Sequence, residues 1–304
     1  MFVAELLASS LRMSVPILLT AIGAVFTERS GIVNIGLEGM MIVGSFWASV
    51  GAYFYGPMMG LLFAMTAGAF LALIHSVTTV TFRVNQVVSG VALNILAYGS
   101  SRFLSLMIFG KATTSHHVSG FNEVDIPGLS NIFFLKPLLT DISPVLIMAL
   151  VLVPISKYII DKTVFGLRLR SVGENPLAAD TLGINVFKMR YAGVIISGML
   201  AGVAGAYLTM EHTGMYVEGM TQGKGYIAMA AMIFGNWTPT GTFGASLLFG
   251  FAEALSLRAG EGSVIPYQFI KMIPYVLTLA VLTGIVKKST PPAASGEPYD
   301  RTTG

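Results

Sequence analysis

A few polar and aromatic side chains interrupt the apolar stretches of this 304-residue sequence. Asn34 and Glu38 open one stretch just after a glycine, where they could cap a broken helix or turn polar groups toward a cavity. Asn94 lies within another stretch, and its amide needs either a polar solute or, as we favour, a neighbouring helix. Phe46 and Trp47 could stack on the flat ring of a solute or anchor the chain at a membrane interface. We predict that these five residues belong to a solute pathway whose chemistry is hydrogen bonding and stacking.

Two charged residues also lie inside apolar stretches. Glu253 precedes Arg258 by five residues, and a charge at such a place is costly unless it is paired or close to water. We therefore predict a local ion pair between Glu253 and Arg258. Arg102 lies near the end of its stretch and can extend its guanidinium to the lipid headgroups.

No pattern in the sequence suggests a catalytic or metal-binding centre. Cysteine is absent, and neither His-Glu-x-x-His nor Gly-x-Ser-x-Gly occurs. The four histidines lie at or beyond the ends of apolar stretches: His75, His116, His117 and His212. The ATP-binding pattern Gly-x-x-x-x-Gly-Lys-Ser/Thr is also missing. We predict a chain that is no enzyme, holds no metal and binds no ATP by itself.

The composition is that of a membrane protein. Hydrophobic residues make up 54% of the chain and charged residues 11%, with a mean hydropathy of +0.74, whereas soluble domains carry about 25% charged residues. The net charge of +3 comes from basic clusters between apolar stretches, which favours a lipid bilayer as partner over a nucleic acid.

Nine stretches are long or nearly long enough to cross a bilayer. They are residues 3–26, 37–55, 58–82, 86–109, 141–161, 187–210, 223–236, 241–258 and 266–287. The seventh is short and is closed by Gly235, Pro239 and Gly241, which favours a half-helix or re-entrant segment. We therefore predict an all-α, polytopic transmembrane helix bundle of about nine spans with broken or re-entrant helices.

The basic residues also predict an orientation. Most of the 18 Lys and Arg face the cytoplasm if the N-terminus is outside and the C-terminus inside. Residues 1–288 would then form the membrane domain, with an outer loop at about 110–140 and an inner loop at about 162–187. Residues 289–304, rich in Pro, Ser and Gly, are predicted to be a disordered cytoplasmic tail.

Two parts of the sequence resemble each other faintly. The segments that begin NIGLEGMM and GYIAMAAM each place a glycine-interrupted apolar stretch before a glycine-rich helix. By the predicted orientation they run in opposite senses, as in transporters built from inverted repeats. We expect such a repeat here.

The charged segment 165–193 contains a complete short-helix signature. Asn175 is a suitable N-cap, Pro176 the first helical residue and Gly183 the stop. A short capped helix at the inner face could fit a groove on a soluble partner or lie against lipid headgroups. The residues alone leave both open.

Three blocks carry a resemblance to a known family. RSVGENPLAADTLGI (170–184) resembles the cytoplasmic loop of permease subunits of ATP-binding cassette importers for simple sugars, nucleosides and branched-chain amino acids. FTERSGIVNIGLEGMMIVGSF (26–46) and RVNQVVSGVALNILAYG (83–99) are similar to the nucleoside and simple-sugar branch.

The resemblance implies the membrane-spanning subunit of such an importer. Its partners would be an ATPase subunit that carries ATP and Mg, a second permease, identical or related, and an extracytoplasmic substrate-binding protein in a bacterial-type cytoplasmic membrane. The family's coupling segment maps onto Gly173, Glu174, Asn175, Pro176, Ala179 and Gly183. The main alternative is an ion-coupled secondary transporter of a small polar solute, for which Glu38 and Glu253 are the membrane carboxylates available.

Overall fold

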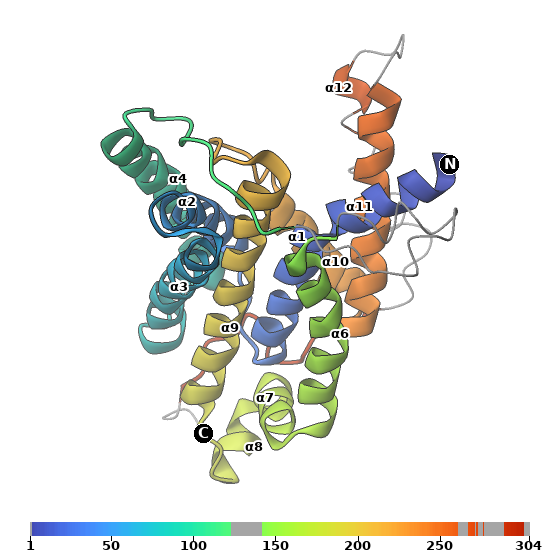
Figure 1. The fold of residues 1–304 in the computed structure, drawn as a ribbon. Helices are drawn as coiled ribbons and strands as arrows, with labels where there is room; N and C mark the ends of the chain where they lie inside the picture. The colour runs from blue at the N-terminus through green and yellow to red at the C-terminus, as the bar shows by residue number, and fades with distance from the viewer. Residues whose placement is uncertain are drawn as a thin grey trace.

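The computed structural model describes residues 2–122, 142–260, 267–270, 272, 276 and 289–300. The described residues form a bundle of helices (Figure 1). In chain order these are α1 (Phe2–Arg29), α2 (Leu37–Tyr55), α3 (Pro57–Ser76), η1 (Val77–Thr81), α4 (Gln86–Phe109), α6 (Pro144–Lys162), α7 (Val164–Glu174), α8 (Pro176–Thr181), α9 (Val186–Tyr207), η2 (Leu208–Thr213), α10 (Lys224–Phe234), α11 (Pro239–Gly260) and α12 (Tyr267–Ile270). The elements η1 and η2 are π-helical turns that extend α3 and α9.

The predicted all-α membrane bundle is confirmed. The first eight predicted stretches coincide with helices to within a few residues, and the short seventh is the 11-residue α10. Among the described residues, five helices are long and apolar enough to cross a membrane: α1, α3 with η1, α4, α6, and α9 with η2. Most of the ninth stretch and of the outer loop lies outside the described residues.

Two helix triples, α1–α2–α3 and α9–α10–α11, form the centre of the bundle. Helices α1 and α9 pack on each other, α1 also contacts α10 and α11, and α9 also contacts α2 and α3. The N-termini of α2 and α10 are in contact. A Cβ added to Gly225, at the start of α10, would lie only 2.5 Å from the backbone nitrogen of Glu38, at the start of α2. The first helix of each triple thus packs against the helices of the other triple, which is the packing expected of the predicted inverted repeat.

Small residues allow these helices to approach closely. Gly68 of α3 leaves no room for a Cβ against the backbone of Gly198 in α9, and Gly250 of α11 leaves none against Ser10 in α1. Close backbone approach at small residues is a main source of helix association in lipid. These glycines therefore allow α3 of the first triple to pack closely against α9, and α11 of the second triple to pack closely against α1.

Candidate functional site

Each triple contains a stretch where the helical backbone is interrupted. We call residues 30–36, between α1 and α2, the first break, and residues 214–223, between η2 and α10, the second break. In the first break, Gln86 Oε1 accepts a hydrogen bond from the Val33 backbone nitrogen at 2.6 Å. Backbone groups inside a membrane must find such partners within the protein.

The amides of Asn34 and Asn94 complete the bonding of the first break. Asn34 Oδ1 accepts from the Gly36 nitrogen at 3.0 Å, and its Nδ2 donates to Ser197 Oγ of α9 at 3.1 Å. Asn94 Nδ2 donates to the Ile35 carbonyl at 3.1 Å, and Asn94 Oδ1 accepts from the Gly39 nitrogen at 2.7 Å. This interhelical bonding is the alternative that the sequence favoured for Asn94.

Glu38 connects the two breaks. Its carboxylate accepts hydrogen bonds from the backbone nitrogens of Gly223 and Gly225, at 2.9 and 2.7 Å, and from the Thr221 hydroxyl at 2.5 Å. A carboxylate that receives the free N–H groups of a helix start is strongly stabilised there. Glu38, on α2, therefore acts as the cap of α10.

The predicted pathway residues are mostly buried. Asn34, Glu38, Asn94 and Phe46 are all less than 7% exposed. Phe46 packs edge-on against Tyr216 with ring centroids 5.5 Å apart.

Trp47 is half-buried and lines an apolar groove between α2, α3 and α4. Asn34, Glu38, Asn94 and Phe46 do not line this groove, the cavity beside the second break or the pocket beside residues 293–300. Their geometry is that of residues that hold the broken helices in place.

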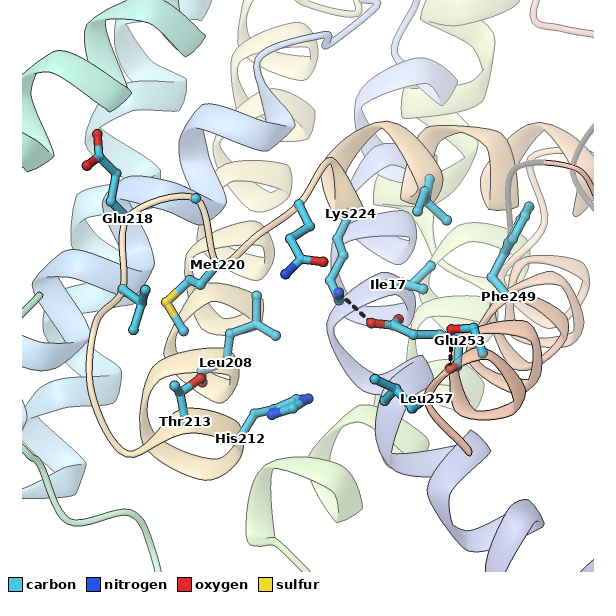
Figure 2. Close-up of a pocket in the computed structure, with 15 residues that line it drawn as sticks. Ile17, Leu208, His212, Thr213, Glu218, Met220, Lys224, Phe249, Glu253 and Leu257 are labelled. Carbon is cyan, nitrogen blue, oxygen red and sulfur yellow. Dashed lines mark hydrogen bonds and ion pairs between the residues drawn. The ribbon is translucent and has the colours of Figure 1, made fainter. Parts of the chain in front are cut away.

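A cavity of about 360 Å³, lined by apolar residues together with several charged and polar side chains, lies beside the second break (Figure 2). Its walls come from α1, η2, the second break, α10 and α11. Lys224 Nζ donates to Glu253 Oε1 at 2.7 Å across it, and the lysine side chain is only 7% exposed. His212 and Gln222 add further hydrogen-bonding groups to the wall. Such a site can bind a small solute that carries several polar groups.

The predicted pair between Glu253 and Arg258 is wrong. Glu253 is paired with Lys224, and Arg258 lies 3.4 Å from Glu5 at the start of α1. Lys224, which the charge pattern assigned to the outer side, is buried inside the bundle. The sequence contains a signal for the pair between Lys224 and Glu253. Both residues lie in apolar stretches, where opposite charges are stabilised by pairing.

Arg102 and Glu218 form a second pair beside the cavity. Arg102 Nη1 lies 3.4 Å from Glu218 Oε1, and the arginine side chain is 61% exposed. Glu218 belongs to the second break and also lines the cavity. Arg102 therefore has a protein partner as well as access to the surface.

The six residues of the predicted coupling segment form one continuous unit at the end of the bundle opposite the cavity. Gly173 is buried against the Arg29 carbonyl, with no room for a Cβ, and Glu174 ends α7. Asn175 Oδ1 accepts from the Ala178 nitrogen at 3.0 Å, and Pro176 is the first residue of α8. The predicted short capped helix is thereby confirmed.

The far side of α8 is exposed and apolar. Ala179 is buried on the inner side of the helix, and Gly183 leaves it with a φ of +78°. Leu177 and Leu182 are 44% and 80% exposed. Exposed apolar side chains at this end of the bundle can be covered by a partner protein or by lipid headgroups.

The last described segment differs from the predicted disordered tail. Residues 289–300 lie against α7 and α9: the Ala294 nitrogen donates to the Gly173 carbonyl at 2.9 Å, and Tyr299 is only 5% exposed. The composition rich in Pro, Ser and Gly makes a tight turn here, with Gly296 at a φ of +82°. Burial of Tyr299 and Ala294 supplies the apolar contact that composition alone does not reveal.

The described residues contain no group of three or more His, Cys, Asp or Glu side chains that could hold a metal ion.

Comparison with known proteins identifies the family of the chain. Residues 6–282 match the profile of a family described as the permease component of branched-chain amino acid transport systems.

Named relatives cover nearly the whole chain. The chain is 45% identical to the guanosine ABC transporter permease protein NupQ of Bacillus subtilis, over 93% of this chain and 92% of that protein. It is 41% identical to the nucleoside ABC transporter permease protein NupC of Lactococcus lactis, over 97% and 96%. It is 32% identical to the putative glucose ABC transporter permease protein TsgC13 of Haloferax volcanii, over 93% and 92%.

Proposed function

The chain belongs to the family of permease components of branched-chain amino acid transport systems, and on that premise we propose that it forms the translocation pathway of an ATP-binding cassette importer for nucleosides. The names of two relatives above 40% identity, NupQ and NupC, support nucleosides as the solute. ATP is hydrolysed on a separate subunit, which docks on this chain.

The observation that carries the proposal is the exposed short helix α8. The coupling unit from Gly173 to Gly183 presents Leu177 and Leu182 on a helix fixed to the bundle by buried Ala179. A soluble subunit that grips these leucines can pull on α7 and, through Gly173, on the end of α1. This is a mechanical route from ATP hydrolysis to the membrane helices.

The solute pathway includes the cavity beside the second break. Lys224, Glu253, Gln222 and His212 offer charged and neutral hydrogen-bonding groups to the hydroxyls and ring nitrogens of a nucleoside. The five residues first predicted for the pathway do not line this cavity and instead support the segments beside it. Asn34, Glu38 and Asn94 fix the broken helices that border it, and Phe46 and Trp47 pack beside them.

The proposed assembly has two permease subunits, an ATPase on the cytoplasmic face and a substrate-binding protein on the other. The bundle lies in a bacterial-type cytoplasmic membrane with its N-terminus outside. Arg29, Arg83 and the basic residues of α7 lie together at the α8 end, which supports placing that end in the cytoplasm. The exposed apolar face of α4 offers a surface to lipid and to the second permease.

The test is affinity purification of the tagged chain from a host that carries the whole transporter, combined with uptake of labelled guanosine, cytidine and glucose. We expect an ATPase subunit to co-purify and nucleosides to be taken up. The double variant Leu177→Asp, Leu182→Asp should lose both. Lys157→Gln, which removes a charge from an exposed position of α6, should keep both. Uptake driven by an ion gradient without an ATPase would identify a secondary transporter and overturn the proposal.

A further inference from the structure

Residues 289–300, which we call the C-terminal strap, contact the coupling unit directly. The Ala293 nitrogen donates to Glu174 Oε2 at 3.3 Å, and the Ala294 nitrogen donates to the Gly173 carbonyl at 2.9 Å. Glu174 and Gly173 are the last residues of α7, immediately before α8. The strap therefore holds the turn on which α8 is mounted.

The other contacts of the strap reach parts of the bundle that are distant in sequence. The Gly296 nitrogen donates to the Gly31 carbonyl, in the first break, at 3.1 Å. Arg83 donates to the Asp300 carboxylate from both Nη1 and Nη2, the latter at 3.0 Å. Such a two-pronged pair fixes direction as well as distance. One short segment thus joins the coupling unit, the first break and the turn before α4.

Buried side chains fix the strap between these contacts. Arg190 of α9 is 1% exposed, and its Nη1 donates to the Glu297 carbonyl at 3.1 Å. The Arg190 guanidinium also lies 6.0 Å from the centre of the Tyr299 ring, which packs edge-on against Phe187. These contacts hold the middle of the strap against α9.

The contact at Arg83 leads back to the first break. Arg83 has a φ of +57°, a left-handed conformation that is uncommon for a residue with a side chain, and it forms the turn between η1 and α4. Three residues later, Gln86 accepts the hydrogen bond from the Val33 nitrogen. The end of the strap is therefore linked through one turn of chain to the backbone that precedes α2.

We propose that the C-terminal strap is a positioning element of the transport cycle, which transmits the movement of α8 to the first break and to the start of α4. Because α8 is joined to the strap at Gly173 and Glu174, displacement of α8 pulls on Gly31 and Arg83 at once. The proposal rests on the proposed function, since it needs an ATPase that moves α8. It adds residues 289–300, Arg83 and Arg190 to the coupling apparatus.

The ion pair between Arg83 and Asp300 gives the sharpest test. Arg83→Asp and Asp300→Arg are made separately and together in the complete transporter, and nucleoside uptake and solute-stimulated ATP hydrolysis are measured. Each single reversal should lower both by about two- to thirtyfold, the range expected for a residue that carries coupling. The double reversal should restore much of the loss, because the charges again attract.

Two readouts separate positioning from a purely structural role. Both single variants should accumulate in the membrane and retain the ATPase subunit at the wild-type ratio, because α8 keeps its exposed face. Lys157→Gln should behave as wild type throughout. Wild-type uptake in both single variants, or an equal loss of uptake and of ATPase retention that the double reversal fails to repair, would overturn the proposal.

The α8 variant keeps this test distinct from that of the proposed function. If Leu177→Asp, Leu182→Asp releases the ATPase while the strap variants transport normally, the strap inference fails and the importer assignment stands. If no ATPase is recovered with the wild-type chain, the proposed function itself fails.

Discussion

The two breaks solve the same structural problem in different ways. In the first break, neutral amides and a glutamine close the backbone: Asn34, Asn94 and Gln86, all at most 6% exposed. The second break borders an open cavity and carries charges, with Lys224 against Glu253 and Glu218 against Arg102. Glu38 joins the two breaks, because it belongs to α2 and its side chain caps α10.

The two breaks therefore differ in their access to solvent. The buried neutral amides of the first break bond its backbone and favour one conformation, although Gln86 Nε2 has no hydrogen-bond partner. Glu218 and Glu253, whose side chains are 25% and 21% exposed, retain access to water beside the cavity, whereas Lys224 is buried. We propose that the first break serves chiefly to transmit force and that the second contacts the solute.

The most damaging substitution should be Gly225→Val, at the point where the two breaks meet. A Cβ there would lie 2.5 Å from the Glu38 nitrogen and 2.6 Å from its Cα, so the two helix starts would be forced apart. We expect little folded protein in the membrane, as measured by fluorescence-detected size exclusion. Gly244→Val, where no atom lies within 4 Å of an added Cβ, is the matched control and should accumulate normally.

The charges of the second break should show an asymmetry. Glu253→Met strands Lys224 in a buried place and should cost about 3–5 kcal/mol, whereas Lys224→Met leaves a carboxylate that is 21% exposed and should cost less. The double variant should recover stability but not uptake. Thermal unfolding in detergent measures the first effect, and equal losses in the two single variants would argue against a buried lysine.

Asn94→Leu tests the hydrogen bonding of the first break. The change leaves the Gly39 nitrogen and the Ile35 carbonyl without partners, and each orphaned group costs about 1–3 kcal/mol. We expect a lower melting temperature with an unchanged apparent affinity for the solute in the protein that remains. A selective rise in the KM for uptake, with no loss of stability, would instead place Asn94 in the solute pathway.

The smallest stability effect should come from Glu218→Gln. Its pair with Arg102 is partly open to solvent at 3.4 Å, and such pairs contribute at most about 1 kcal/mol. Because Glu218 lines the cavity, the KM for nucleosides should rise while the melting temperature stays within a degree or two of wild type. A large loss of stability would show that the second break is locked like the first.

Much of the fold follows from local patterns. Apolar stretches of spanning or near-spanning length predicted α1, α2, α3, α4, α6, α9, α10 and α11. The spacing of Asn175, Pro176 and Gly183 predicted α8, because caps and helix stops act over a single turn. The helical conformation of α7 inside the expected loop was missed, since its mixture of charges and glycines is weakly helical by itself.

The sequence by itself determined that this chain is a helical membrane protein with broken helices and a short capped helix, because hydropathy and capping depend on neighbouring residues. Only the tertiary structure decided that Glu253 takes Lys224 as its partner and not Arg258, that Glu38 caps α10, and that residues 289–300 are bound to the coupling unit. These pairings join residues that lie far apart in the chain. Their energy depends on burial and distance, which exist only once the helices have packed.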